Sequence, residues 1–113
     1  MNKESLTAKL LDLAEGRETP ETWQNWWDEH ETELEALLSR GEFLKLKPCR
    51  HGFQWVPVFG SQKRAIAILE KSGLAFEASN LYQERYLAEL DAFCKEQERM
   101  QREKQKGFKA SHP

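Results

Sequence analysis

The pattern of hydrophobic and polar positions predicts helices over most of this chain. From Thr19 to Gly41, large apolar side chains recur at intervals of three and four residues, which is the spacing of one helical face. Thr19 is a suitable N-cap, Pro20 suits the first turn, and Gly41 can take the left-handed conformation that ends a helix. The apolar face carries three of the chain's four tryptophans, and we expect Trp26 and Trp27 to be largely buried.

Two shorter segments also have helical spacing. Ser5–Ala14 has leucines on one side and precedes the Trp-rich helix by a short link, so the two should form a helical hairpin. A further helix is predicted over Gln62–Ser72, with Ser61 as its N-cap and Gly73 at its end. Residues 64–69 also alternate in side-chain bulk, so a strand is the competing interpretation there.

The last helix, beginning near Asn80, is predicted to be the longest. Beyond residue 94 its apolar face is interrupted at Gln97 and Met100 is the next large apolar residue, which is too little for a coiled-coil seam. We therefore expect a single helical domain over residues 1–94, followed by a charged helical extension and flexible tail over 95–113. The chain is expected to be a monomer.

The middle of the chain is the least regular part. Phe43–Lys47 alternates between apolar and basic side chains, and Phe53–Phe59 is rich in aromatic and β-branched residues. Pro57 would restrict any strand to an edge. The prediction is thus a mainly α fold of about four helices in one small domain, with an irregular or short β-hairpin segment at residues 43–59.

Charge is unevenly distributed, although the net charge of the 113 residues is only −2. Residues 1–39 hold three basic and ten acidic groups, whereas residues 40–73 hold seven basic and two acidic groups. The two blocks either match each other internally or form separate faces for charged partners. Candidate partner-binding acidic residues are Asp28, Glu31 and Glu35. Candidate basic and aromatic residues, for a protein or nucleic-acid partner, are Lys45, Lys47, Arg50, Trp55, Lys63 and Arg64.

Motifs for catalysis or cofactor binding are missing from the sequence. Cys49 and Cys94 are far apart, His30 lies on the apolar helical face without a second ligand at helical spacing, and no phosphate-binding glycine loop is present. Cys49 precedes His51 closely, but such local spacing is weak support for a reactive thiol. We expect no enzymatic activity, no cofactor and no metal. The longest apolar runs are too short for a membrane span or a signal peptide, which favours a cytoplasmic location without membrane association.

These properties favour a protein–protein interaction module, such as an adaptor, an inhibitor or an immunity-type binder, that uses charged surfaces. The alternative is binding of single-stranded nucleic acid through residues 43–64, where cations and aromatic rings are interleaved. Residues Thr19–Trp27 are similar to Thr-Pro-Glu-x-Trp-x-x-Trp segments at the ends of some bacterial helical-repeat proteins. This resemblance covers one helix start and implies no functional residue.

Overall fold

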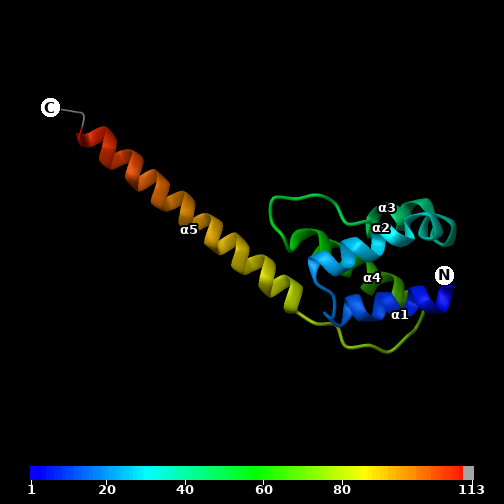
Figure 1. Cartoon of the computed structure of the whole chain (residues 1–113). Helices are drawn as coiled ribbons and strands as arrows, with labels where there is room; N and C mark the ends of the chain where they lie inside the picture. Colours follow the sequence, from blue (N-terminus) through cyan, green and yellow to red (C-terminus); the bar gives the residue numbers. More distant parts are fainter. Residues whose placement is uncertain (111–113) are drawn as a thin grey trace.

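The computed structural model describes residues 1–110, with side chains described through residue 103. Over this part of the chain the fold is mainly helical, as predicted, and it contains no strand. The five helices of the described residues (Figure 1) are α1 (Lys3–Ala14), α2 (Pro20–Leu37), α3 (Arg40–Leu46), α4 (Val56–Lys71) and α5 (Leu81–Ala110). The additional helix is α3, which lies in the segment expected to be irregular or a hairpin.

The junction between α1 and α2 follows the local signals of the sequence. Gly16 ends α1 in a left-handed conformation (φ 77°), and a Cβ atom added there would lie 2.7 Å from Ser79 Oγ, so only glycine fits. Thr19 caps α2 as expected. Its Oγ1 accepts a hydrogen bond from Thr22 N (3.1 Å), while Thr22 Oγ1 accepts one from Thr19 N (2.8 Å).

The predicted end of the second helix at Gly41 is wrong. α2 ends at Leu37, and α3 begins after Ser39, whose Oγ accepts a hydrogen bond from Glu42 N (3.2 Å). Gly41 lies inside α3, and the described glycines with positive φ are Gly16 and Gly73. Ser39 is itself a strong N-cap residue, so a new helix starts where the glycine was expected to end the old one.

Of the two alternatives for residues 43–59, the β-hairpin does not occur in the described part of the chain, whereas irregular structure is found at residues 47–55. Phe43 and Leu46 are three residues apart on α3 and both are buried, so the apparent alternation belongs to a short helix. An irregular segment with bends and a turn, residues 47–55, leads to α4. Pro57 lies in the first turn of α4, where its missing N–H group has no helical partner to lose.

The start of α4 also differs from the prediction, whereas its end agrees. The helix begins at Val56, so Ser61 is an interior residue that donates a buried hydrogen bond from Oγ to Leu46 O (2.7 Å). Gly73 ends the helix in a left-handed conformation (φ 73°), as expected. Residues 64–69 lie within α4, and the strand interpretation of that segment is therefore wrong.

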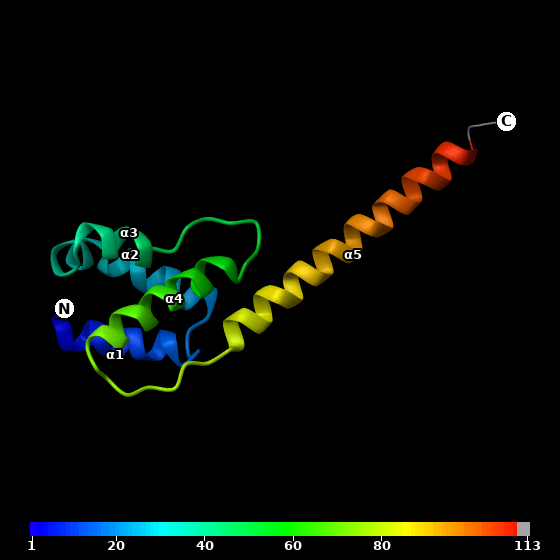
Figure 2. The same ribbon diagram turned by 180° about the vertical axis from the view of Figure 1, so that it is seen from behind.

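The core forms where α4 packs against α1 and α3, with α2 beside them (Figures 1 and 2). Trp23 and Trp27 of α2 are fully buried. Trp26 lies at the edge of the core and is partly buried. Its ring stacks on Trp23 with 5.3 Å between ring centroids, and Lys9 Nζ lies 5.4 Å from its centroid. The fully buried pair is thus Trp23 with Trp27, rather than Trp26 with Trp27.

α5 begins against the core and then leaves it. Tyr82 is fully buried and its ring stacks on Trp55 at a centroid distance of 5.9 Å. One turn later, Tyr86 stacks on Phe59, also at 5.9 Å. Beyond Phe93 the helix projects away from the other four (Figure 2), and the molecule is 71 Å long but only 28 × 21 Å across. We call residues 94–110 the arm.

Glu89 of α5 closes the start of α4. Its carboxylate accepts hydrogen bonds from Gln54 N (2.8 Å) and Trp55 N (2.7 Å). Trp55 occupies the N-cap position of α4 but makes no side-chain capping bond. The carboxylate of another helix therefore supplies the missing acceptors and places negative charge at the positive end of α4. This contact ties α5 to the segment that precedes α4.

Candidate functional site

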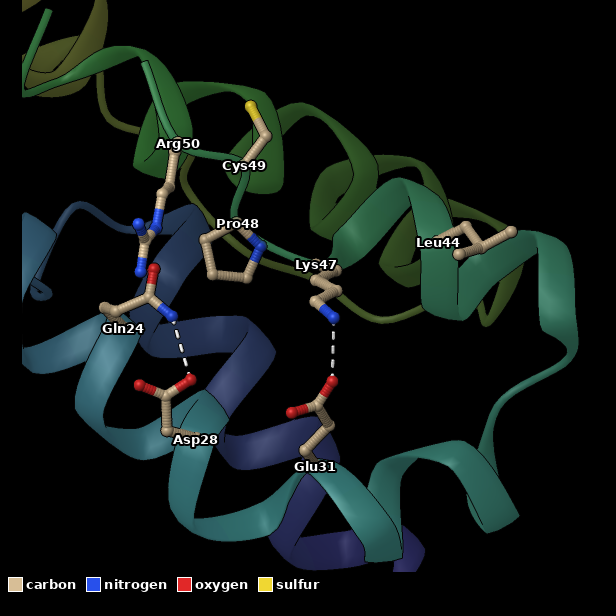
Figure 3. A pocket seen from close by; sticks show the side chains of 8 residues that line it. All are labelled: Gln24, Asp28, Glu31, Leu44, Lys47, Pro48, Cys49 and Arg50. Carbon is tan, nitrogen blue, oxygen red and sulfur yellow. Dashed lines mark hydrogen bonds and ion pairs between the residues drawn. The ribbon is translucent and has the colours of Figure 1, made fainter. Parts of the chain in front are cut away.

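The acidic residues singled out in the sequence form a row on α2. Asp28, Glu31 and Glu35 are three and four residues apart, so they lie on one side of the helix. That side borders a hollow of about 590 Å³ between α2 and the segment after α3 (Figure 3). The lining residues of the hollow are Gln24, Asp28, Glu31, Leu44, Lys47, Pro48, Cys49 and Arg50.

Lys47 connects the two sides of this hollow. Its Nζ lies 2.8 Å from Glu31 Oε1, in an ion pair that joins the segment after α3 to α2. The hydrogen bond and charge of Glu31 raise the pKa of Lys47, and the charges of Asp28 and Glu35 add to this shift. All three carboxylates of the acidic row therefore act on one ammonium group.

The side of the hollow opposite α2 is basic. It carries Lys47 and Arg50, and Figure 3 shows the Arg50 side chain extending toward Gln24 of α2. Gln24 in turn donates a hydrogen bond from Nε2 to Asp28 Oδ1 (2.9 Å). Pro48 is buried between the two cations and holds the chain close to α2. The hollow thus has an acidic wall from α2 and a basic wall from residues 47–50.

A second hollow of about 280 Å³ continues from the first along α2. Its lining residues are Glu35, Arg40, Phe43 and Leu44. Leu44 borders both hollows, and 58% of its surface is exposed, which is unusual for a large apolar side chain in so small a domain. We call the two hollows together the charged groove. Leu44 was not among the residues expected to bind a partner, because its exposure depends on α3, which the sequence pattern did not predict.

The basic and aromatic candidates do not form one continuous surface. Lys47 and Arg50 line the charged groove, whereas Lys45 is exposed elsewhere on α3. Trp55 is partly buried and stacks on Tyr82 of α5. Lys63 Nζ lies over the Phe59 ring, 4.4 Å from its centroid, and the neighbouring Arg64 is partly buried on α4. Trp55 is the aromatic residue of this set, and its ring is already in contact with α5.

The described histidines make local hydrogen bonds, and the two cysteines are free and exposed. His30 Nδ1 lies 2.9 Å from Trp26 O at the edge of the core, and His51 Nδ1 accepts a hydrogen bond from Phe53 N (3.0 Å). Cys49 and Cys94 are free and exposed, and Figure 3 shows Cys49 Sγ pointing away from α2. Within the described residues, no three His, Cys, Asp or Glu side chains are grouped in a way that could hold a metal ion.

Comparisons with known proteins place this chain in no family: protein-family models, curated protein sequences and solved structures gave no match. Among the described helices, none is long and apolar enough to cross a membrane.

Proposed function

We propose that the protein is a non-enzymatic cytoplasmic module that binds another protein through the charged groove, as an adaptor, an inhibitor or an immunity-type binder. The observation that supports this most is the presence of an acidic wall, a basic wall and the exposed Leu44 in one groove. Protein interfaces combine an apolar centre that excludes water with polar groups that select the partner. The groove offers both.

The acidic wall favours a partner with cationic side chains. Glu31 already binds Lys47, which shows how an ammonium group fits between α2 and its neighbour. Asp28 and Glu35 lie one turn to either side of Glu31, and neither is in an ion pair with another described residue. A lysine or arginine of the partner can therefore pair with them, while an apolar side chain covers Leu44.

The proposal is tested by affinity capture from the native cell with three forms of the protein. The groove variant, Asp28→Lys with Glu35→Lys, reverses the two unpaired carboxylates. The control variant, Glu29→Lys with Glu70→Lys, makes the same change in net charge at exposed positions outside the groove. Mass spectrometry then identifies the proteins captured by each form.

The expected result is a captured protein that the wild-type and control forms share and the groove variant loses. Its complex should also form more slowly at high salt, because charge complementarity mainly increases the association rate. Capture of the same proteins by all three forms would contradict the role of the groove. Thermal melts of the three forms check that the charge changes leave the fold intact.

A further inference from the structure

The arm carries a row of cations whose spacing matches that of the acidic row on α2. Lys95, Arg99 and Arg102 are four and three residues apart, so they lie on one side of α5. Along α2 the acidic row has intervals of three and then four residues. When the two helices run antiparallel, the intervals of the two rows therefore coincide. The opposed pairs are then Asp28 with Arg102, Glu31 with Arg99, and Glu35 with Lys95.

Both rows are accessible, and both have the same length. Each spans eight residues of helix, which is a rise of about 10 Å. Asp28 and Glu35 are exposed on α2, and the side chains of Lys95 and Arg99 are 75% and 64% exposed. In Figures 1 and 2 the arm points away from α2, so it cannot place its cations on the acidic row of its own chain. A second copy of the chain can.

We propose that the cation row of the arm in one copy binds the acidic row of α2 in a second copy. The proposal rests on the proposed function, because it assigns a partner to the same groove. It differs from a coiled coil, since the contact is made by charged helix faces and needs no apolar seam. Two copies can form a dimer in which each arm binds the acidic row of the other copy. Alternatively, each arm can bind a further copy, which gives a linear oligomer.

Charges on either side of the two rows are compatible with this contact. On the arm, acidic residues flank the cations, with Glu98 on one side and Glu96 on the other. One of these flanks meets the basic wall of the groove, which carries Lys47 and Arg50. The other meets the far side of the acidic row. Helical spacing places the uncharged Asn25, Thr32 and Ala36 there, and Glu29 lies at the outer edge of that side.

The contact exchanges existing ion pairs for new ones, so it should be weak and sensitive to salt. Lys95 Nζ lies 3.0 Å from Asp91 Oδ2, Arg99 is paired with Glu96, and Lys47 holds Glu31. Exposed ion pairs of this kind change an equilibrium by about fivefold at most, and high salt screens them. The self-association constant should therefore be modest and should fall as ionic strength rises.

The test is sedimentation equilibrium of the full chain over a range of concentrations, at about 0.05 M and about 0.5 M salt. The groove variant (Asp28→Lys with Glu35→Lys) and an arm variant (Lys95→Glu with Arg102→Glu) each carry like charges on both rows. Each alone should lose tenfold or more in association constant relative to wild type. The control variant Glu29→Lys with Glu70→Lys leaves both rows unchanged and should associate at least as strongly as wild type.

An equimolar mixture of the groove variant and the arm variant provides the decisive measurement. In that mixture the acidic arm of one copy meets the cationic groove of the other, and the cationic arm meets the acidic groove, so association should return to within a few-fold of wild type. Monomeric wild-type protein at low salt, or a mixture that stays monomeric, would overturn the self-contact. If the groove variant still loses its captured protein in that case, the proposed function stands alone. If the mixture associates but capture is unchanged, only the self-contact stands.

Discussion

Replacement of Glu89 by alanine is expected to lower the free energy of unfolding by about 1–2 kcal/mol. The carboxylate accepts hydrogen bonds from Gln54 N (2.8 Å) and Trp55 N (2.7 Å) at the start of α4. Loss of an N-cap acceptor costs about 0.5–2 kcal/mol, and a negative charge at a helix N-terminus contributes about 0.3–1 kcal/mol. Because the site is partly exposed, the two contributions should not reach the sum of their upper limits.

Urea denaturation of four proteins measures this effect. They are the wild type, Glu89→Ala, Glu89→Gln and the control Glu98→Ala, which removes an exposed carboxylate from the same helix. Glu89→Gln keeps an uncharged acceptor and should fall between the wild type and Glu89→Ala, whereas Glu98→Ala should stay within about 0.5 kcal/mol of wild type. The amide protons of Gln54 and Trp55 should shift in NMR spectra of Glu89→Ala. Equal stability of Glu89→Ala and Glu98→Ala would refute the capping role.

Four further outcomes are expected. In urea denaturation, Trp27→Ala should cost about 3–5 kcal/mol because the side chain is fully buried, and Trp26→Ala should cost less, about 1–2 kcal/mol; equal costs would contradict the assigned burial. Burial raises the pKa of Tyr82 from 10.0 to about 12, so the unfolded chain loses this phenol proton first. Melting temperatures should consequently fall as pH rises between those values, and Tyr82→Phe should lack this part of the fall. A chain ending at Lys95 should melt within a few degrees of the full chain, since no core residue of the described part of the chain lies beyond it; failure to fold would show that residues 96–113 contribute to the core. Fluorescence titration with a single-stranded oligonucleotide at low salt should show no binding, because the rings near Trp55 already pack on α5; binding that weakens with a log–log salt slope of about −0.7 per phosphate would support the nucleic-acid alternative.

Helix ends were predictable where one residue determines the backbone conformation. Gly73 adopts positive φ at the end of α4, and Thr19 caps α2 through its own hydroxyl. Each of these signals is local, so the sequence alone was sufficient to locate them. Gly41 was misinterpreted because a glycine can also lie inside a helix, and the neighbouring Ser39 carried the stronger signal.

The helical parts of the middle segment were not predicted because its pattern fits two structures. Phe43 and Leu46 suit a short helix as well as an interrupted strand, and a run of a few residues cannot distinguish the two periods. Pro57 is compatible with an edge strand and also with the first turn of a helix. The choice was decided by distant contacts, among them the Glu89 carboxylate, which supplies the hydrogen-bond acceptors at the start of α4.

The components of the candidate site were visible in the sequence, but their grouping was not. Charge counting identified Asp28, Glu31 and Glu35 as one set and Lys47 and Arg50 as another, without showing that the sets face each other. The acidic and basic sets lie side by side because α3 turns the chain back toward α2, so that Lys47 Nζ lies 2.8 Å from Glu31 Oε1. Leu44 could have been found by assigning α3 correctly, since its helical position places it away from the buried Phe43 and Leu46.

The same segment of chain connects the charged groove with the direction of the arm. Residues 47–55 provide the basic wall at their beginning, and at their end Gln54 and Trp55 are held by Glu89 of α5. A change that releases Glu89 therefore loosens both the arm and the segment that carries Lys47 and Arg50. If the arm of one copy binds the groove of another, this carboxylate supports both partners in that contact, together with the Tyr82 and Tyr86 stacks and the Lys47–Glu31 ion pair. Glu89→Ala should then weaken self-association even though Glu89 lies in neither of the two charged rows.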